Sequence, residues 1–299
     1  YFSAKEISMH QIALKKGCLI LLSAVLLILS PVDKASAWGA DGHRLICAMA
    51  EAKLTPEAKS MLSETLRMGK FLDNNADEDF PEACLWPDKA RHTTHKGSYE
   101  EHFINVPKSE DSVDLARDCA ALNCVATAIQ RNLVYLSRDA QGKREKARKA
   151  AALRFLAHFV GDLHQPLHVG NGEDWGGNKI RVNWYGKKAN LHGIWDYEIL
   201  KKAGITYPDS LEYLQEIKPE DSASDVLAWI RTSFRLARDN AYKDTEGNLI
   251  ASGDTLGDAY FERAKPIVMS QISLSSSRLA YLLNELAAGT LDTNILIVQ

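Results

Sequence analysis

The sequence predicts a single all-α domain with one small β-hairpin, and three observations support this fold class. Apolar residues recur at helical spacing along most of the chain. One isolated stretch, NKIRVNWYGKKAN at residues 178–190, instead alternates around a turn at Tyr185-Gly186-Lys187, which is typical of two short strands. From residue 38 onward there is no internal repeat, low-complexity linker or change of composition. A chain of this length is long enough for one large domain with a substantial core.

The periodicity predicts six helical segments in the order of the chain. They are 42–66, 115–138, 147–163, 191–202, 223–242 and 257–288. The first should break near Thr55-Pro56, because proline begins helices but disrupts their interior. Two long loops remain, at 68–101 and 165–178, and long loops in compact domains are commonly functional.

The first 37 residues have the composition of a secretory signal peptide. Lys15 and Lys16 precede an apolar run, and an Ala-Ser-Ala triplet ends the segment. The apolar run is shorter than the roughly 20 residues that a membrane-spanning helix needs, although a retained membrane anchor is the alternative. We expect translation to start at Met9 and the leader to be removed, which leaves a domain of residues 38–299 that begins at Trp38 and is periplasmic or secreted.

The charge of the chain argues against a protein that holds duplex DNA along a basic surface. Its formal net charge is −3 at pH 7, and removal of the lysine-containing leader makes it more negative. Proteins that bind duplex DNA through its phosphates usually have an excess of basic residues. A polyanionic substrate would therefore have to be held locally, for example by metal ions.

Four cysteines remain after Cys18 leaves with the leader, and an even number in an exported protein favours disulfides. Four cysteines allow three pairings. We favour Cys119–Cys124, which closes the shortest loop, and by subtraction Cys47–Cys84. A zinc site made of these cysteines is less expected, because no Cys-x-x-Cys spacing occurs.

The stretch HFVGDLHQPLH, residues 158–168, concentrates potential metal ligands. His158 and Asp162 are four residues apart and share one face of the predicted helix. Pro166 ends that helix, and His168 follows where the chain turns. Imidazole and carboxylate groups on one face can converge on a zinc ion. A buried histidine–aspartate hydrogen bond is the structural alternative for any single pair.

Further candidate ligands lie in four other segments. The segment LHGIWDYEI contains a second histidine and aspartate at a spacing of four, and LWPDKAR contains an aspartate three residues before Arg91. The segments EHFINVP and GADGH each contain one further histidine. The full set is His43, Asp88, His102, His158, Asp162, His168, His192 and Asp196. This many nitrogen and oxygen ligands suit two or three zinc ions with open coordination positions, as in catalytic sites.

Trp38 follows the predicted cleavage point, so its α-amine would become free on processing. The amine and the carbonyl oxygen of one residue can chelate a metal together, and His43 could face the same ion. Apolar packing of the indole at the start of the domain is equally compatible with the spacing.

Taken together, these motifs resemble the S1/P1 nucleases, a family of zinc-dependent single-strand nucleases related in fold to zinc-dependent phospholipase C. The matching pieces, in the family's order, are W-G-x-x-G-H, W-P-D-x-x-R, H-F-I-N, H-F-x-G-D-x-H-Q-P-L-H, G-G-N and N-L-H-x-x-W-D, over residues 38–196. The resemblance implies three zinc ions. The implied ligand sets are Asp88, His102, His158 and Asp162 for one ion; Trp38, His43 and the bridging Asp162 for its close neighbour; and His168, His192 and Asp196 for the third.

The resemblance also implies an activity, hydrolysis of the 3′-O–P bond in single-stranded DNA and RNA to 5′-phosphorylated nucleotides, with 3′-nucleotides as further substrates. A water between two zinc ions would react as hydroxide, and the third ion would stabilise the leaving oxygen. Asp88 and Arg91 are the implied catalytic residues, with Arg91 steadying charge on the phosphoryl oxygens. Phe103 and Asn105 occupy implied substrate-binding positions, and Asn105 departs from the aspartate of several relatives.

Two alternatives remain at this point, a zinc-dependent phospholipase C and a zinc-binding protein without turnover. Phe103 and the Gly-Gly-Asn stretch favour the nuclease. We expect a monomer that has no stable protein partner and, once the leader is removed, no membrane attachment. Of the remaining histidines, we expect His164 to lie at the helix end without binding metal, and His92 and His95 to be solvated.

Overall fold

The computed structural model describes residues 38–73, 79–119, 121, 123–217 and 225–292. The predicted leader lies outside these residues. The elements are α1 (Ala40–Ala52), α2 (Pro56–Arg67), η1 (Met68–Phe71), α3 (Phe80–Ala83), α4 (Trp86–Ala90), η2 (Lys96–His102), β1 (Ile104–Val106), α5 (Leu115–Asp118), α6 (Val125–Leu136), α7 (Gly142–Leu163), η4 (Pro166–His168), β2 (Val169–Asn171), β3 (Arg181–Trp184), β4 (Lys187–Asn190), α8 (Leu191–Gly193), η5 (Ile194–Glu198), α9 (Ile199–Lys202), α10 (Leu211–Gln215), α11 (Val226–Leu236), η6 (Ala237–Ala241), β5 (Thr255–Leu256) and α12 (Asp258–Ala288).

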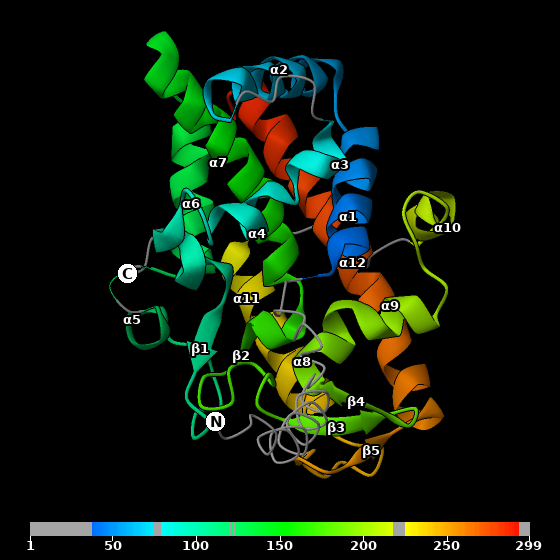
Figure 1. The fold of residues 1–299 in the computed structure, drawn as a ribbon. Helices are drawn as coiled ribbons and strands as arrows, with labels where there is room; N and C mark the ends of the chain where they lie inside the picture. Colours follow the sequence, from blue (N-terminus) through cyan, green and yellow to red (C-terminus); the bar gives the residue numbers. More distant parts are fainter. Residues whose placement is uncertain (1–37, 74–78, 120, 122, 218–224, 293–299) are drawn as a thin grey trace, which may run out of the picture. The chain divides into compact units, whose positions relative to one another are not determined.

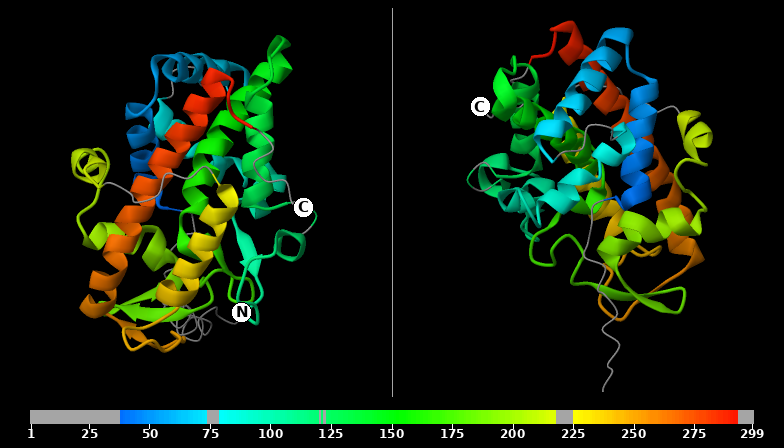
Figure 2. Two further views of the ribbon diagram at one scale, coloured as in Figure 1. Left: turned by 180° about the vertical axis from the view of Figure 1, so that it is seen from behind. Right: turned by 45° about the horizontal axis from the view of Figure 1, so that its top comes forward.

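The core is built around α7, and the prediction of an all-α fold is confirmed. Every residue from Ala150 to Leu163 is buried, so this half of α7 is enclosed on all sides by other elements. It packs against α6, α2 and α12, and α12 in turn packs along α1 (Figure 1). Seen from behind, α11 and α12 cover the opposite side of α7 (Figure 2). No helix among the described residues is long and apolar enough to cross a membrane.

The helix boundaries follow local chemistry, with one correction. Thr55 caps α2 by accepting a hydrogen bond from the Ala58 amide, and Pro56 occupies its first turn, so the predicted break is present. The predicted continuous helix over 115–138 is wrong. It is two helices, α5 and α6, and the Cys119–Cys124 disulfide joins the residue that follows α5 to the residue that precedes α6.

The predicted loops contain more structure than the periodicity indicated. The segment 68–101 includes η1, α3, α4 and most of η2, and the segment 165–178 includes η4 and β2. These helices are too short to show a recognisable apolar period. They nevertheless fix the backbone of segments that contain candidate ligands.

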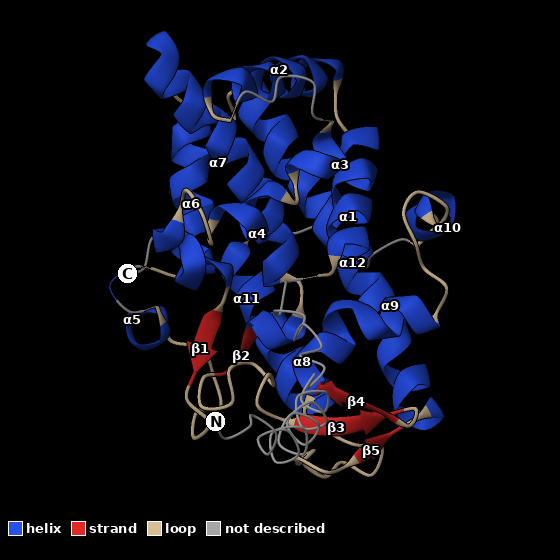
Figure 3. Cartoon of the chain, viewed as in Figure 1, coloured by secondary structure: helices blue, strands red, loops and turns tan. Residues whose placement is uncertain are grey.

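In the described ranges the strands form two small sheets (Figure 3). The predicted hairpin is present as antiparallel β3 and β4, and the turn residues Tyr185 and Gly186 both have positive φ, as a tight two-residue turn requires. β5 joins β3 in parallel, which the sequence did not predict. A second, unpredicted parallel pair joins β1 to β2 and so brings together the chain that follows His102 and the chain that follows His168.

Both expected disulfides are present, Cys47–Cys84 and Cys119–Cys124. The first ties the buried face of α1 to the end of α3. It thereby holds the Cys84 carbonyl oxygen against His158 of α7, with the His158 Nδ1 atom 2.8 Å away.

Candidate metal centre

The last turns of α7 place His158 and Asp162 on one buried face against α1. The His43 ring of α1 stacks on the His158 ring, with centroids 4.0 Å apart. This approach depends on Gly161, since a Cβ there would lie 2.9 Å from His43 Nδ1. The glycine between Phe159 and Asp162 is therefore required by the close contact of two ligand-bearing helices.

Asp162 lies at the centre of the cluster. Its Oδ2 atom is 2.8 Å from His102 Nδ1 and 3.2 Å from His158 Nε2, and its Oδ1 atom is 3.4 Å from His43 Nε2. One carboxylate therefore faces two groups of imidazoles through its two oxygens, which is the geometry that a bridging ligand needs.

Asp88 and Arg91 come from α4 and its C-terminal end. Asp88 Oδ1 is 3.7 Å from His158 Nε2 and 3.0 Å from Arg91 Nη2. The Arg91 side chain is nearly buried, with its guanidinium over the ring of Tyr99, 5.6 Å from the centroid. The arginine is thus held beside the candidate metal ligands by a carboxylate and an aromatic ring.

A third group combines η4 with the π-helical turn η5. His192 Nε2 is 3.4 Å from Asp196 Oδ2, and the two residues flank the start of η5. The Gln165 side-chain amide donates to Asp196 Oδ1 at 2.7 Å, which orients the carboxylate and leaves Oδ2 directed at His192. Single π-helical turns of this kind are frequent at functional sites.

Backbone carbonyls fix the protonation of three histidines. The Nδ1 atoms of His158, His168 and His192 lie 2.8, 2.7 and 2.6 Å from the carbonyl oxygens of Cys84, His102 and Gly176. A carbonyl oxygen only accepts, so each Nδ1 must carry the proton and donate it. The lone pair of each neutral ring is then on Nε2, as in metal-binding histidines oriented by a carbonyl.

The donor atoms satisfy the test for a metal site. Three groups of residues place their ligand atoms within 4.8 Å of one another: His43 with His158 and Asp162, Asp88 with His102 and His158, and His168 with His192 and Asp196. Several of these buried atoms have no hydrogen-bond partner among the described residues, namely His43 Nδ1 and Nε2, His102 Nε2, Asp162 Oδ1, His168 Nε2 and Asp196 Oδ2. Unsatisfied buried polar atoms are costly, and cations would satisfy them.

The electrostatics suit cation binding. Burial lowers the pKa of His102 to about 4 and that of His192 to about 3, so both rings are neutral near pH 7. Burial opposes ionisation of Asp162, but His158 and His168 hold its pKa well below the usual range. Burial raises the pKa of Asp196 well above its ordinary value. Neutral imidazoles and carboxylates that need a positive partner are the forms that bind zinc.

Trp38 is fully buried beside this cluster. The amide of the next residue, Gly39, donates to the Asp196 carbonyl oxygen at 2.8 Å, and a Cβ on Gly42 would lie 2.8 Å from the Trp38 Cβ. The segment before α1 is therefore in contact both with η5, which contains Asp196, and with the turn of α1 that precedes His43.

Comparison with known proteins decides the family. The model of the S1/P1 nuclease family matches residues 38–288. The chain belongs to the S1/P1 nuclease family. It is 32% identical to Endonuclease 1 of Arabidopsis thaliana over 91% of this chain and 94% of that protein. It is 30% identical to Nuclease P1 of Penicillium citrinum, over 83% and 97%, and 27% identical to Nuclease S1 of Aspergillus oryzae, over 90% and 98%.

Membership of the S1/P1 nuclease family makes the protein a hydrolase that acts as a phosphodiesterase. The metal-type residues predicted from the sequence all fall in the three groups described above, except Trp38, which is next to them. Arg91 lies at the edge of the Asp88 group.

The two predicted substrate-binding residues are near this edge. Phe103 follows His102 directly, is half-buried and meets Tyr99 edge to face, with ring centroids 5.9 Å apart. Asn105 is exposed in β1, against Gly172, where a Cβ would lie 3.0 Å from the Asn105 Cβ. The sequence reasoning missed Tyr99, an exposed aromatic that contacts both Arg91 and Phe103. Its spacing of three from His102 within η2 was the available signal.

Two other histidines are settled by their contacts. His164 ends α7 away from the metal-type groups: its Nδ1 donates to the Val160 carbonyl oxygen, and its Nε2 accepts from Arg278 at 2.7 Å. His95, expected to be solvated, is half-buried between the rings of Trp86 and Phe155, so that prediction is wrong. The aromatic neighbours come from α4 and α7, which the sequence of the loop does not reveal.

Proposed function

We propose that this protein is an exported, zinc-dependent endonuclease that hydrolyses the 3′-O–P bond of single-stranded DNA and RNA to 5′-phosphorylated products, and that it also acts as a 3′-nucleotidase. The observation that supports this most is the set of buried histidine and aspartate atoms that lack hydrogen-bond partners among the described residues and belong to three groups of potential metal ligands. A structural histidine–aspartate network would satisfy these atoms internally.

Three zinc ions are proposed, in the sets suggested by the family resemblance. The ligands would be Asp88, His102, His158 and Asp162 for the first; the amine and carbonyl of Trp38 with His43 and Asp162 for the second; and His168, His192 and Asp196 for the third. Bound zinc would supply activation of water near neutral pH and stabilisation of charge on the phosphate. The carbonyls of Cys84, His102 and Gly176 would keep three ligand rings in the required tautomer.

Arg91 would position the scissile phosphate. Its side chain is anchored through Nη2 to Asp88, and a planar guanidinium pairs with two oxygens of a phosphate at once. In the same region, Tyr99 and Phe103 offer an aromatic surface next to ligand His102. A base stacked there must leave its neighbours in the strand. Single strands do this readily, whereas a duplex must first unpair and unstack, which explains the proposed strand preference.

Export is part of the proposal. Disulfides form and persist in oxidising compartments such as the periplasm or the extracellular space. The two disulfides of this protein therefore support a periplasmic or secreted location. Removal of residues 1–37 would also release the Trp38 amine. N-terminal sequencing of the exported protein should begin at Trp38, and a different start would contradict the proposed role of the amine.

The test is turnover on three substrates by the zinc-loaded protein. We expect rapid cleavage of a single-stranded oligonucleotide to 5′-phosphorylated products, much slower cleavage of the same sequence as a duplex, and no hydrolysis of short-chain phosphatidylcholine. Hydrolysis of the lipid without cleavage of the oligonucleotide would identify a phospholipase C instead. Stoichiometric zinc with no turnover of any substrate would identify a zinc-binding protein.

A further inference from the structure

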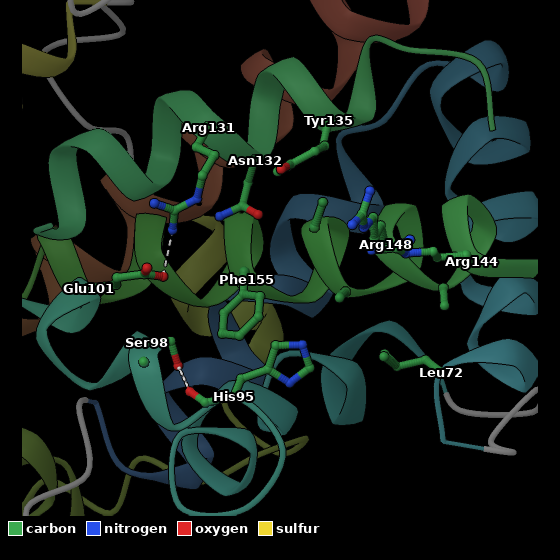
Figure 4. Close-up of a pocket in the computed structure, with 14 residues that line it drawn as sticks. Leu72, His95, Ser98, Glu101, Arg131, Asn132, Tyr135, Arg144, Arg148 and Phe155 are labelled. Atoms are coloured by element: carbon green, nitrogen blue, oxygen red, sulfur yellow. Dashed lines mark hydrogen bonds and ion pairs between the residues drawn. The ribbon is translucent and has the colours of Figure 1, made fainter. Parts of the chain in front are cut away.

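A separate pocket of about 530 Å³ lies between α6, α7 and η2 and contains none of the metal-type ligands (Figure 4). Phe155 of α7 lines it and packs on Phe159, with ring centroids 5.2 Å apart; Phe159 in turn meets the ring of His102, 5.0 Å away. The pocket is thus separated from the metal centre by a wall of aromatic rings, and its volume is in the range of small-molecule sites.

The pocket has a positive lining in a chain of net negative charge. Arg131, Arg144 and Arg148 line it, with Glu101 as the one acidic lining residue. Arg131 is paired with Glu101, at 2.6 Å between Nη2 and Oε2. Arg144 and Arg148 are exposed and have no hydrogen-bond or ion-pair partner in the part of the chain that the structure describes. Two guanidinium groups are therefore available to an anion, and arginine pairs especially well with phosphate.

The rest of the lining suits a planar, hydrogen-bonding ring. Asn132 is 5% exposed, and its amide nitrogen donates to the Ala128 carbonyl oxygen. Tyr135, one helical turn further along α6, is partly exposed at the rim, and His95 lies opposite beside Phe155 (Figure 4). Aromatic faces stack on nucleobases, and a buried amide oxygen accepts from a base amino group.

We propose that this pocket, defined by Arg131, Arg144, Arg148, Asn132, Tyr135 and His95, is a second nucleotide-binding site. A nucleotide phosphate binds Arg144 and Arg148, and its base packs against Tyr135 within reach of Asn132. The nucleotide is either part of the strand being cut or a free mononucleotide. The inference rests on the proposed function only for the choice of nucleotides as ligands.

The direct test is binding of adenosine 5′-monophosphate to the zinc-loaded protein by calorimetry, with three proteins compared. The variant R144A/R148A should bind one fewer nucleotide per chain, or should bind that nucleotide at least about tenfold more weakly. The control K143A/K188A removes the same charge from exposed positions outside the pocket and should bind like wild type. Equal stoichiometry and affinity in all three proteins would overturn the proposal.

A second variant tests whether the site recognises a base. Tyr135→Ala should weaken binding of adenosine 5′-monophosphate and leave binding of inorganic phosphate unchanged. Inorganic phosphate that binds wild type as tightly as the nucleotide does would show an anion site without base recognition and would overturn the nucleotide assignment.

Kinetics distinguish the two sources of the nucleotide. If the site holds the strand, R144A/R148A should raise KM for a 20-nucleotide strand and leave KM for a dinucleotide unchanged. If it holds a free mononucleotide, the same variant should lose inhibition by adenosine 5′-monophosphate with an unchanged KM. A variant unaltered in both assays would contradict the site. The calorimetry needs no turnover, so intact nucleotide binding without nuclease activity would contradict the proposed function and not the pocket.

Discussion

The end of α7 and the loop after it contain three histidines that make the same hydrogen bond through Nδ1 but have different surroundings. In His158, His168 and His164 the Nδ1–H group donates to a backbone carbonyl, so in each ring the lone pair is on Nε2. The Nε2 of His158 faces Asp162, and the Nε2 of His168 has no hydrogen-bond partner in the part of the chain that the structure describes, whereas the Nε2 of His164 accepts from Arg278. All three are buried.

Burial alone therefore does not distinguish these three rings. The partner of the remaining Nε2 lone pair separates the proposed metal ligands, His158 and His168, from His164. The polar groups of the proposed ligands would be satisfied by a cation, whereas those of His164 are satisfied within the protein and stabilise it. Removing a proposed ligand should abolish chemistry, and removing His164 should lower stability alone.

The largest effect should follow Asp162→Asn. The amide keeps the shape of the side chain but loses the charge that faces two groups of imidazoles. We expect cleavage of single-stranded DNA to fall by more than about 10³-fold, beyond the loss of a single transition-state donor, and the zinc content to drop. The control is Asp118→Asn, a buried carboxylate paired with Arg117 that belongs to none of the three groups. Full activity with reduced zinc, or an equal loss in the control, would contradict the bridging role.

Arg91→Lys should have the next largest effect. Lysine retains the positive charge but not the planar fork that pairs with two phosphate oxygens, so kcat should fall about 10²-fold, with zinc content unchanged. Arg44→Lys is the matched control, because Arg44 is also paired with a carboxylate, Glu82, but on the outer side of α1. A kcat within twofold of wild type would show that Arg91 does not contact the phosphate.

By contrast, His164→Leu should affect stability and spare the chemistry. The substitution removes an acceptor of the buried Arg278 side chain, and losing a buried hydrogen-bond partner costs about 2 kcal/mol. We expect this decrease in the free energy of urea unfolding at pH 7.5, with zinc content and kcat unchanged. Loss of zinc without loss of stability would place His164 among the ligands and contradict its separation from His158 and His168.

The smallest effect is the pH dependence of that stability loss. Burial lowers the pKa of His164 to about 3 from its ordinary 6.5, with Arg278 acting in the same direction. Below pH 6.5 the unfolded chain therefore binds a proton at His164 that the folded protein does not, and this costs wild type up to about 1.4 kcal/mol per pH unit. The leucine variant has no such penalty. Its stability loss should therefore shrink by about 1 kcal/mol as the pH falls from 6.5 to 5.5, and a constant or growing loss would contradict the assigned proton.

The sequence predicts much of this arrangement because its information is local. The spacing of four that joins His158 to Asp162, and His192 to Asp196, needs only a helix, and the family motifs order the remaining ligands. The carbonyl of Cys84 that fixes the His158 tautomer is 74 positions away in the chain, and the Gln165 amide that orients Asp196 is 31 away. No periodicity encodes such contacts. The same holds for the β1–β2 pair and the half-buried His95, which depend on how distant segments pack.

The most direct test of the three-metal account is the zinc content of two proteins, one beginning at Trp38 and one with a single glycine before it. The account predicts three zinc ions per chain and rapid single-strand cleavage for the first. With its Trp38 amine in a peptide bond, the second should lose one zinc ion and most of its activity. Equal zinc content and equal activity in both proteins would show that Trp38 only packs against the cluster, and the three-metal centre would be contradicted.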